Sequence, residues 1–354
     1  MLFSLVSTIF NEAKRLRQTI ADLEAQTIKP AEIIITDAGS SDASWEILTE
    51  WQQQSAVPIV LLKEEGCNVA RGRNIAIKAA KYDLIVSTDF GCCFHPEWLQ
   101  SLIRPFEEDK TLQVVGGAFS VIEKNVTSLP AKSDFILQNG YPIVLDDFFS
   151  VSSRSIAYKK QVWEEIGGYP EWLTLAADDT IFWKLVKHYK FPYALVEKPY
   201  VYWGRHKSNK AFAKEAYRYG LGDGESKISY RNFWSNLIET VLRYSMFVLL
   251  ILLLSLIVLG FAPWYILFTI ILLFPGLRSY KNAYKNWSQL KSTKYNFKVF
   301  LNALWQLELS RIQYIKGYIK GLSTKDPAKI AGRVALWQTL HRPESDNQWA
   351  AISK

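Results

Sequence analysis

The chain has 354 residues, 49% of them hydrophobic, and a formal net charge of +8. This length allows one large domain with an additional segment. The three cysteines, Cys67, Cys92 and Cys93, have no zinc-finger spacing and an odd count, which excludes a disulfide framework and favours a reducing compartment.

Apolar, strand-like runs alternate with helical segments through the first half of the chain. The strand-like runs are Leu2–Ile9, Ala31–Thr36, Val57–Leu62, Tyr82–Thr88 and Val114–Val121, and Ser150–Ala157 helps to close the domain. The helical segments run from Glu12 to Gln26, from Asp42 through Trp51, and over Asn68–Ala80, Pro96–Phe106, Lys159–Ile166 and Asp178–His188. This alternation predicts a doubly wound, mostly parallel sheet, with an irregular stretch at Glu123–Phe149. The N-terminus reads as a first strand and not as a signal peptide.

Acidic residues follow three of these apolar runs. Asp37 ends IIITD and precedes Gly39, Asp89 ends LIVSTD, and the pair Asp178-Asp179 opens a helix. Carboxylates past the ends of parallel strands lie at the sheet edge where α/β proteins bind ligands. Asp37 is suited to the N–H of a base or to ribose hydroxyls, with Gly39 admitting the ligand; its alternative role is a turn residue or N-cap.

The other two acidic clusters are suited to metal binding and proton transfer. Asp89 is suited to a divalent cation that bridges a diphosphate, although hard cations usually take more than one protein oxygen. One member of the Asp178-Asp179 pair is expected to face the cleft as a general base, while the other caps the helix. A purely capping pair is the alternative.

Two basic groups are candidates for binding a leaving diphosphate. They are Arg71, Arg73 and Asn74 in ARGRN, and Arg205-His206 after Trp203. Arginine donors or a metal must stabilise the charge that accumulates on a departing diphosphate. His206 is the best-placed histidine for a nitrogen ligand to the metal; its alternative is an ordinary surface residue.

A long uncharged segment follows, from Tyr244 to Leu277. A spanning helix needs about 20 apolar residues, so this segment is too long for one upright pass and slightly short for two. Pro263 lies near its middle, and the sequence predicts a transmembrane hairpin within residues 241–278, made of Val241–Gly260 and Pro263–Leu277. Arg243 is expected to snorkel to the membrane interface. A re-entrant or interfacial helix pair is the alternative.

The positive charge is concentrated after this hairpin. From Arg278 to Arg333 there are twelve Lys and Arg residues against Glu308 and Asp326. Basic residues beside a hydrophobic hairpin are typical of a cytoplasmic flank and attract anionic headgroups, which indicates membrane lipids and not nucleic acid as partners. Phe297–Leu322 has apolar residues near helical spacing and is expected either to lie in the headgroup plane or to pack on the catalytic domain.

Several segments together resemble a family 2 glycosyltransferase with the GT-A fold. They are VSTIFNE at 6–12, QTIKPAEIIITDAGSSD at 26–42, ARGRNIAIKAA at 70–80, DLIVSTDFG at 83–91, IGGYPE at 166–171 and AADDT at 176–180. They cover residues 1 to about 210 in the family's order. The resemblance implies a GT-A domain over 1–230, the hairpin at 241–278, and a basic amphipathic juxtamembrane region with a tail over 279–354.

The resemblance also implies roles for single residues. Asp37 would bind the base, with Glu12 and Thr8 nearby, and Asp89 would hold ribose and metal as the first carboxylate of a D-x-D motif. Asp179 would be the catalytic base of an inverting displacement, and Arg73-Asn74 match an "RN" element that lines the donor site.

Two departures from the family pattern concern the site. The D-x-D motif reads Asp89-Phe90-Gly91, so the second carboxylate is absent and the affinity for Mg²⁺ or Mn²⁺ depends on what else completes the shell. The acidic pair reads Asp178-Asp179, with a shorter acid in the first position. The Q/R-x-x-R-W sequence of processive synthases is absent, which favours single addition.

The expected function is inverting transfer of a sugar from a nucleotide-sugar donor, UDP- or GDP-linked, to a hydroxyl acceptor. A lipid-linked or cell-envelope acceptor is expected, because the catalytic domain would lie in the cytoplasm against an inner membrane crossed more than once. A non-catalytic, sugar-nucleotide-binding membrane scaffold is the alternative, since the second D-x-D carboxylate is missing.

Overall fold

The computed structural model describes residues 1–146, 149–260 and 264–341. Its contacts divide the chain into two units. The sheet unit comprises Met1–Asn125, Pro142–Arg205 and Lys325–Lys354, and the helical unit comprises Val126–Tyr141 and His206–Thr324. The expected turn at Pro263 and the polar tail from Pro343 lie outside the described residues.

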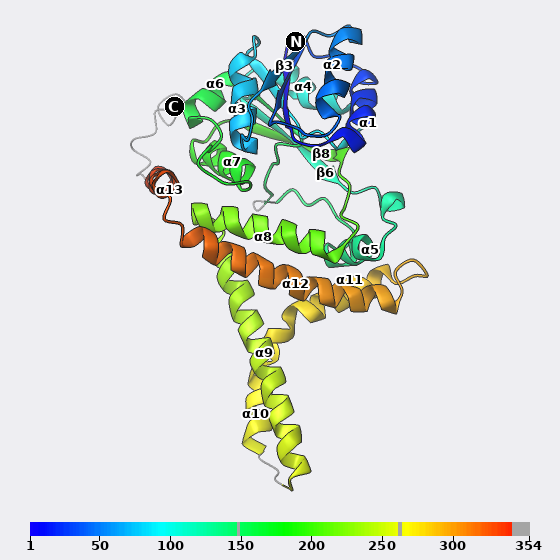
Figure 1. The fold of residues 1–354 in the computed structure, drawn as a ribbon, viewed down its shortest axis with the longest axis vertical. Coiled ribbons are helices and arrows are strands. Elements are labelled where there is room, and N and C mark those ends of the chain that lie inside the picture. Colours follow the sequence, from blue (N-terminus) through cyan, green and yellow to red (C-terminus); the bar gives the residue numbers. More distant parts are fainter. Residues whose placement is uncertain (147–148, 261–263, 342–354) are drawn as a thin grey trace. The chain divides into compact units, whose positions relative to one another are not determined.

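The sheet unit alternates strands and helices as the sequence predicts (Figure 1). Its strands are β1 Ser4–Ile9, β2 Glu32–Asp37, β3 Ile59–Lys63, β4 Leu84–Ser87, β5 Cys93–Phe94, β6 Val114–Ser120, β7 Ile156–Lys159 and β8 Tyr193–Tyr202. Its helices are α1 Ala13–Glu24, α2 Ser44–Gln54, α3 Val69–Ala79, α4 Trp98–Glu108, α6 Lys160–Ile166, α7 Asp178–His188 and α13 Pro327–Leu340, with a 3₁₀ turn η1 at Glu123–Asn125.

These strands form one mixed sheet in the order β3-β2-β1-β4-β7-β6-β8-β5. The half formed by β3, β2, β1 and β4 is parallel, as is the β6–β8 pair. Strand β7 runs antiparallel to both β4 and β6, and β5 runs antiparallel to β8. The GT-A fold class is confirmed, and the first β7 residues lie beside the end of β4, because Ile156 pairs with Ser87.

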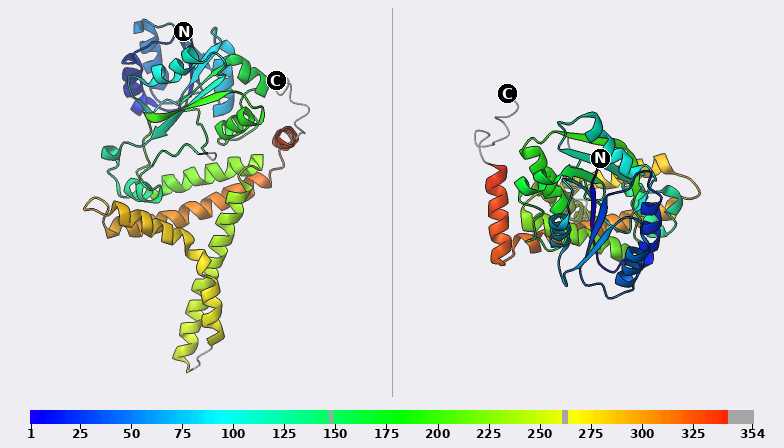
Figure 2. Two further views of the ribbon diagram at one scale, coloured as in Figure 1. Left: turned by 180° about the vertical axis from the view of Figure 1, so that it is seen from behind. Right: turned by 90° about the horizontal axis from the view of Figure 1, so that it is seen from above.

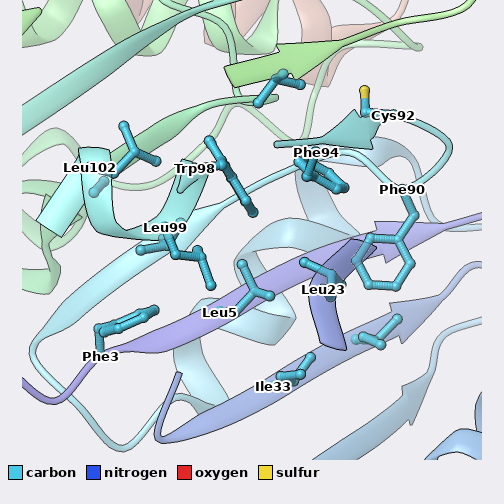
Figure 3. Packing of buried hydrophobic residues seen from close by; sticks show 14 of the residues in the cluster. Phe3, Leu5, Leu23, Ile33, Phe90, Cys92, Phe94, Trp98, Leu99 and Leu102 are labelled. Atoms are coloured by element: carbon cyan, nitrogen blue, oxygen red, sulfur yellow. The ribbon is translucent and has the colours of Figure 1, made fainter. Parts of the chain in front are cut away.

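A hydrophobic core lies on each face of the sheet. Helices α1, α2 and α4 cover one face, where Trp98 stacks on Phe94 with ring centroids 4.4 Å apart (Figure 3). Helices α3, α6 and α7 cover the other face, around Tyr158, Tyr169 and Phe182. These two layers fix the strand ends and the helix starts that carry the polar side chains described below.

The helical unit contains several elements that the sequence did not indicate. Its elements are α5 Leu129–Leu137, α8 Asn209–Ser226, α9 Tyr230–Val258, α10 Trp264–Leu272, η2 Phe274–Leu277, α11 Arg278–Leu290 and α12 Phe297–Leu322. The expectation that 123–149 is irregular throughout is wrong, because α5 forms there with Pro130 in its first turn, where proline is tolerated. Helix α8, expected within the catalytic domain, groups with the helical unit. The domain boundary at residue 230 therefore stays a prediction.

Helices α8 and α12 run side by side through a glycine-lined contact (Figure 2). A Cβ on Gly220 or Gly224 would lie 2.1 Å from the carbonyl oxygen of Tyr314 or Tyr318, and Gly317 and Gly321 meet the α8 backbone equally closely. The amphipathic helix predicted at Phe297–Leu322 is confirmed with the same bounds. One face of it packs on α8, and large apolar side chains such as Trp305 remain exposed on another.

Helix α9 is, within the described ranges, the one helix that is long and apolar enough to cross a membrane. Its most apolar window has a mean hydropathy of 2.5 and is 17% buried. Helix α10 packs against it through Ile266 and Ile270 but has 9 residues, about 14 Å at the rise of an α-helix. Two helices thus lie in and around the segment of the predicted hairpin, and one of them has spanning length; the hairpin that crosses the membrane twice is not supported.

The expectation that Arg243 snorkels is wrong. Its side chain is 0% exposed, and its guanidinium lies 2.7 Å from Glu308 Oε1 and donates to the carbonyl of Gly276 over 2.8 Å. Gly276 allows this approach, because a Cβ there would lie 2.5 Å from the backbone nitrogen of Arg243. The internal carboxylate and carbonyl take the place of the headgroup region as partners for this charge.

Candidate active site

Asp89 and Asp178 meet through one buried arginine. Arg73, in α3, is 2% exposed and donates to Asp89 Oδ1 over 2.9 Å and to Asp178 Oδ2 over 2.5 Å. Its guanidinium lies 4.8 Å from the centre of the Tyr169 ring, which stacks on Phe182 in α7. The strand-end carboxylate and the helix-start carboxylate, predicted from distant segments, are thus joined at the carboxyl edge of the sheet.

Asp179 belongs to the same cluster through a different set of partners. Ser152 Oγ donates to Asp179 Oδ2 over 3.0 Å, and the Arg154 guanidinium donates to Ser152 Oγ over 3.2 Å. Arg154 also lies 3.7 Å from Asp89 Oδ2. Two arginines therefore connect Asp89 with both members of the acidic pair. Asp179 Oδ1 also accepts from the backbone N–H of Thr180 in the first turn of α7 over 2.8 Å.

The two adjacent aspartates have different surroundings. Asp178 is buried, and burial is the main cause that raises its pKa to about 6, with Asp179 and Asp89 adding to the rise and Arg73 opposing it. Asp179 is half-buried, and its two oxygens accept from Ser152 and Thr180. Asp178 is therefore suited to holding Arg73, and Asp179 to reacting with a substrate.

Asp37 ends β2 and has one satisfied and one unsatisfied oxygen. Its Oδ1 accepts from the backbone N–H of Ser40 over 3.0 Å and from Ser40 Oγ over 2.6 Å. Its Oδ2 is buried and has no hydrogen-bond partner among the described residues. Gly39, at φ +89°, makes the turn that positions Ser40. A buried carboxylate oxygen without a partner is suited to the N–H of a ligand, because leaving it unpaired is costly.

Thr8 and Glu12 lie near this edge and have different contacts. Thr8 Oγ1 donates to the Thr36 carbonyl over 3.1 Å, and Gly72 of α3 packs directly on it. Glu12, at the start of α1, has a raised pKa, mainly because of burial, with Asp42 and Asp89 contributing to the rise and Arg15 opposing it. Thr8 therefore positions α3 against β1, whereas Glu12 lies within the electrostatic reach of Asp89.

Arg71 and Asn74 are committed to protein contacts. Arg71 is exposed and forms ion pairs with Glu64 and Glu171. The Asn74 amide donates to the Tyr169 carbonyl over 2.8 Å and accepts from the Trp163 indole over 2.9 Å. Both residues, expected at the donor site, hold the loop that follows α6.

Arg205 and His206 fall on either side of the boundary between the units. Arg205 lies 4.3 Å from the centre of the Trp203 ring, within the sheet unit. In the helical unit, His206 Nε2 lies 3.5 Å from Glu215 Oε1. The roles expected for these residues in donor and metal binding stay predictions.

The side chains around Asp89 do not match the ligands of a tightly held divalent cation. Gly91 supplies no carboxylate, and both Asp89 oxygens face arginines. Within the described parts of the chain, no three His, Cys, Asp or Glu side chains gather closely enough to hold a metal ion. Hard cations need several oxygen ligands, so we derive no chemical step through Mg²⁺ or Mn²⁺.

Ser152 and Arg154 were missed from the sequence. Both precede β7, which runs antiparallel to β4. The start of an antiparallel strand lies at the same sheet edge as the ends of its parallel neighbours, so polar residues before β7 reach the site. The short polar run SSRS directly before a strand is a signal only when the direction of that strand is known.

An α/β sheet with carboxylates at its carboxyl edge belongs to the class of proteins that bind ligands beyond their strand ends. Residues 4–167 match the model of Glycosyl transferase family 2. Within residues 4–167 the chain is therefore similar to family 2 glycosyltransferases, and it spans less than a quarter of the length of the first curated relatives it matches.

Related proteins cover parts of the chain. It is 32% identical over 114 residues to a hyaluronan synthase of Pasteurella multocida, covering 32% of this chain and 12% of that protein. It is 29% identical over 143 residues to a chondroitin synthase of Escherichia coli, covering 40% of this chain and 21% of that protein. A mannosyltransferase from Pyrobaculum calidifontis, in complex with GDP-Man and Mn²⁺, matches with TM-score 0.51 and 14% identity over 92% of this chain and 88% of that one. This structural likeness concerns the fold.

Proposed function

We propose that the chain transfers a glycosyl group from a UDP- or GDP-linked sugar to a hydroxyl acceptor, with inversion at the anomeric carbon. The observation that carries this proposal is the arginine-linked cluster of Asp89, Asp178 and Asp179. It contains a buried carboxylate with a defined partner and a half-buried carboxylate beside it, an arrangement that separates binding from proton transfer.

Asp179 is the proposed general base. Its carboxylate takes the proton of the acceptor hydroxyl, and the acceptor oxygen attacks the anomeric carbon on the face opposite the diphosphate. The anomeric C–O bond breaks, and its electron pair leaves with the nucleoside diphosphate. Ser152 orients the carboxylate by donating to Asp179 Oδ2. Positioned proton acceptors of this kind contribute about 10²- to 10⁴-fold to rate.

The donor is proposed to lie along the ends of β1, β2 and β4. The unpaired Oδ2 of Asp37 is available to a base N–H. Asp89 lies beyond the end of β4, within reach of a ribose or diphosphate held there. The Mg²⁺ or Mn²⁺ predicted at Asp89 and His206 is left out of this assignment, because Asp89 is already engaged by arginines.

The acceptor is proposed to be lipid-linked or part of a cell-envelope glycan at a membrane. Helix α9 has the length and hydropathy of a spanning helix, and Val248, Ile251 and Val258 are exposed on it. Tyr230 and Trp234 are exposed near its start, as aromatic residues at an interface commonly are. We assign α9 as the anchor and the basic, cytoplasmic side as that of the catalytic unit.

The test replaces single carboxylates in the purified full-length protein. Asp179→Asn should lower kcat about 10²- to 10⁴-fold and leave donor affinity within a factor of about three, since the base acts on the acceptor. Asp83→Asn is the matched control, because Asp83 lies just before the opposite end of β4 and is exposed. Transfer is followed with radiolabelled nucleotide sugars, and donor binding by calorimetry.

Three outcomes separate the alternatives. Unchanged turnover in Asp179→Asn would remove the base assignment. Donor binding without transfer or donor hydrolysis in the wild-type protein would favour the non-catalytic scaffold. Loss of donor binding together with transfer would indicate that Asp179 holds the donor and not the acceptor proton.

A further inference from the structure

The backbone conformation at Gly91 disfavours a second metal-binding carboxylate at that position. Gly91 has φ +94°, a conformation that L side chains rarely adopt, and a Cβ there would lie 2.8 Å from Glu12 Oε2. On the other side, Asp89 faces Arg73 at 2.9 Å and Arg154 at 3.7 Å. The end of the Glu12 side chain thus lies where a second D-x-D side chain would begin, and the first carboxylate is already paired with two arginines.

The guanidinium groups of Arg15, Arg154 and Arg205 lie around Trp203-Gly204, beside this position. Arg154 lies 4.2 Å and Arg205 4.3 Å from the centre of the Trp203 ring. Arg15, from α1, lies so near Gly204 that a Cβ there would be 2.9 Å from its Nη2, and its Nη1 is 3.4 Å from the Gly91 carbonyl oxygen. These three guanidiniums come from separate segments of one unit and gather around Trp203-Gly204, and Arg154 also contacts Asp89.

The aromatic rings fix the orientation of this cluster. Phe119 and Trp203 pack edge to face with centroids 5.9 Å apart, and Arg154 lies 5.3 Å from the Phe119 ring as well. Stacking on aromatic faces holds a guanidinium plane while leaving N–H donors at its rim. Because arginine stays charged at any physiological pH and pairs with phosphate in a bidentate manner, such a cluster is suited to a diphosphate.

We propose that Arg15, Arg154 and Arg205 hold the diphosphate of the donor and stabilise its charge, in place of a carboxylate-held divalent cation. The proposal rests on the nucleotide-sugar donor inferred above. During transfer the electron pair of the broken C–O bond moves onto the diphosphate oxygen, and the guanidinium N–H groups donate hydrogen bonds to it. No proton has to move to the leaving group.

The test measures binding of UDP, GDP and inorganic pyrophosphate to the full-length protein by calorimetry, in excess EDTA and in millimolar Mn²⁺. We expect a nucleoside diphosphate to bind in EDTA, with Mn²⁺ changing its affinity by less than about threefold. Arg154→Gln and Arg15→Gln should each weaken this binding about 10-fold or more, because each removes a charged hydrogen-bond donor. Arg154→Lys should restore part of the loss.

Two controls distinguish diphosphate binding by Arg154 from a purely structural role: the binding of a nucleoside without phosphates, and the substitution of another arginine. Uridine or guanosine lacks the diphosphate, so its affinity should be equal in wild type and Arg154→Gln. Arg17→Gln is the control, because Arg17 also lies on α1 but is paired with Glu50 and exposed. A comparable loss of nucleoside affinity in Arg154→Gln would mean that Arg154 only maintains the fold.

The remaining outcomes test the arginine cluster separately from the proposal that the donor is a nucleotide sugar. Nucleoside diphosphate binding that is lost in EDTA and restored by Mn²⁺ would overturn the arginine cluster while supporting the donor. Pyrophosphate binding that depends on Arg154, with no nucleotide binding in either buffer, would support the cluster and contradict the donor class. Absence of all binding would overturn both.

Discussion

Two buried arginines, Arg73 and Arg243, each pair with two carboxylates, and these carboxylates differ in their access to solvent. Arg73 lies between Asp89 and Asp178 in the sheet unit, and Arg243 lies between Glu239 and Glu308 in the helical unit. Asp89 is 35% exposed, whereas the partners of Arg243 are 5% and 12% exposed. The first cluster is open on one side, and the second is closed.

This difference separates a site from a structural joint. The closed cluster ties together α9, α12 and the segment after η2, where the Ser279 backbone donates to Glu239 over 2.7 Å. The open cluster leads through Arg154 and Ser152 to a half-buried carboxylate. A buried ion pair alone is weak evidence for a ligand site or for a structural role. We therefore distinguish the two roles by whether further polar side chains connect the ion pair to solvent.

Breaking each cluster at its arginine gives the largest expected difference. Arg243→Met should lower the free energy of unfolding by about 3 kcal/mol, because it removes the charge that Glu239 and Glu308 share in a buried site. The folded fraction should keep its specific activity. Arg73→Met should reduce stability too, but it should also reduce the specific activity of the folded protein, since Asp89 and Asp178 lose their link. Denaturant unfolding in detergent and assays on gel-filtered protein measure both.

Arg278→Met is the control for the closed cluster. Arg278 lies 3.6 Å from Glu239 Oε2 but is 66% exposed, so its loss should change stability by no more than about 0.5 kcal/mol. A large destabilisation by Arg278→Met, or lost activity in folded Arg243→Met protein, would contradict the assignment of the Arg73 cluster to the active site and of the Arg243 cluster to a structural role.

The open cluster should also respond to pH. The pKa of Asp178 is raised to about 6, chiefly by burial, so its carboxylate is ionised above that value and neutral below it. Protonation removes the charge that holds Arg73. We expect kcat/KM to be constant above about pH 7 and to fall about tenfold for each pH unit below about pH 6.

Asp178→Asn provides the comparison for this profile. The amide cannot ionise, so the variant should have a lower kcat/KM without the fall that begins near pH 6. If kcat/KM falls at low pH in the same way in wild type and Asp178→Asn, the protonation of another group causes the fall. Circular dichroism across the range checks that the protein stays folded.

The sequence predicted the elements whose cause is local and missed those whose cause is tertiary. Strands β1, β2, β3, β4 and β6 have apolar runs, and each was found. Strand β8 is mostly half-buried and contains Pro199, which hides the alternation of a strand. Helix α8 contains Gly220, Gly222 and Gly224, which disfavour helix in isolation, and two of these glycines admit the α12 backbone.

The candidate site shows the same limit. Asp37, Asp89 and the Asp178-Asp179 pair were predicted because strand ends and helix starts are visible in sequence. Their connection through Arg73 was not, because the RN element was assigned to the donor. Arg15 and Arg154 reach the site from a helix and from the start of an antiparallel strand, so their proximity depends on a packing that no local pattern encodes.

The smallest expected effect concerns the crowding at Gly91 in the open cluster. Gly91→Ala and Gly167→Ala both place a Cβ on a residue with positive φ, +94° and +84°. That backbone conformation alone should cost about 1 kcal/mol of unfolding free energy in each variant. A Cβ on Gly167 meets no atom within 4 Å, whereas one on Gly91 meets Glu12 at 2.8 Å.

Displacing Glu12 should therefore cost Gly91→Ala a further amount of about 1 kcal/mol, within the usual range for overpacking. The additional variant Glu12→Ala should remove the excess, because it vacates the space that the new methyl group needs, so that Gly91→Ala in the Glu12→Ala background costs the same as Gly167→Ala. Chemical denaturation of the four variants gives this coupling directly. Equal costs for Gly91→Ala and Gly167→Ala in the wild-type background would mean that Glu12 moves aside freely, and position 91 would then be open to the carboxylate that the arginine cluster is proposed to replace.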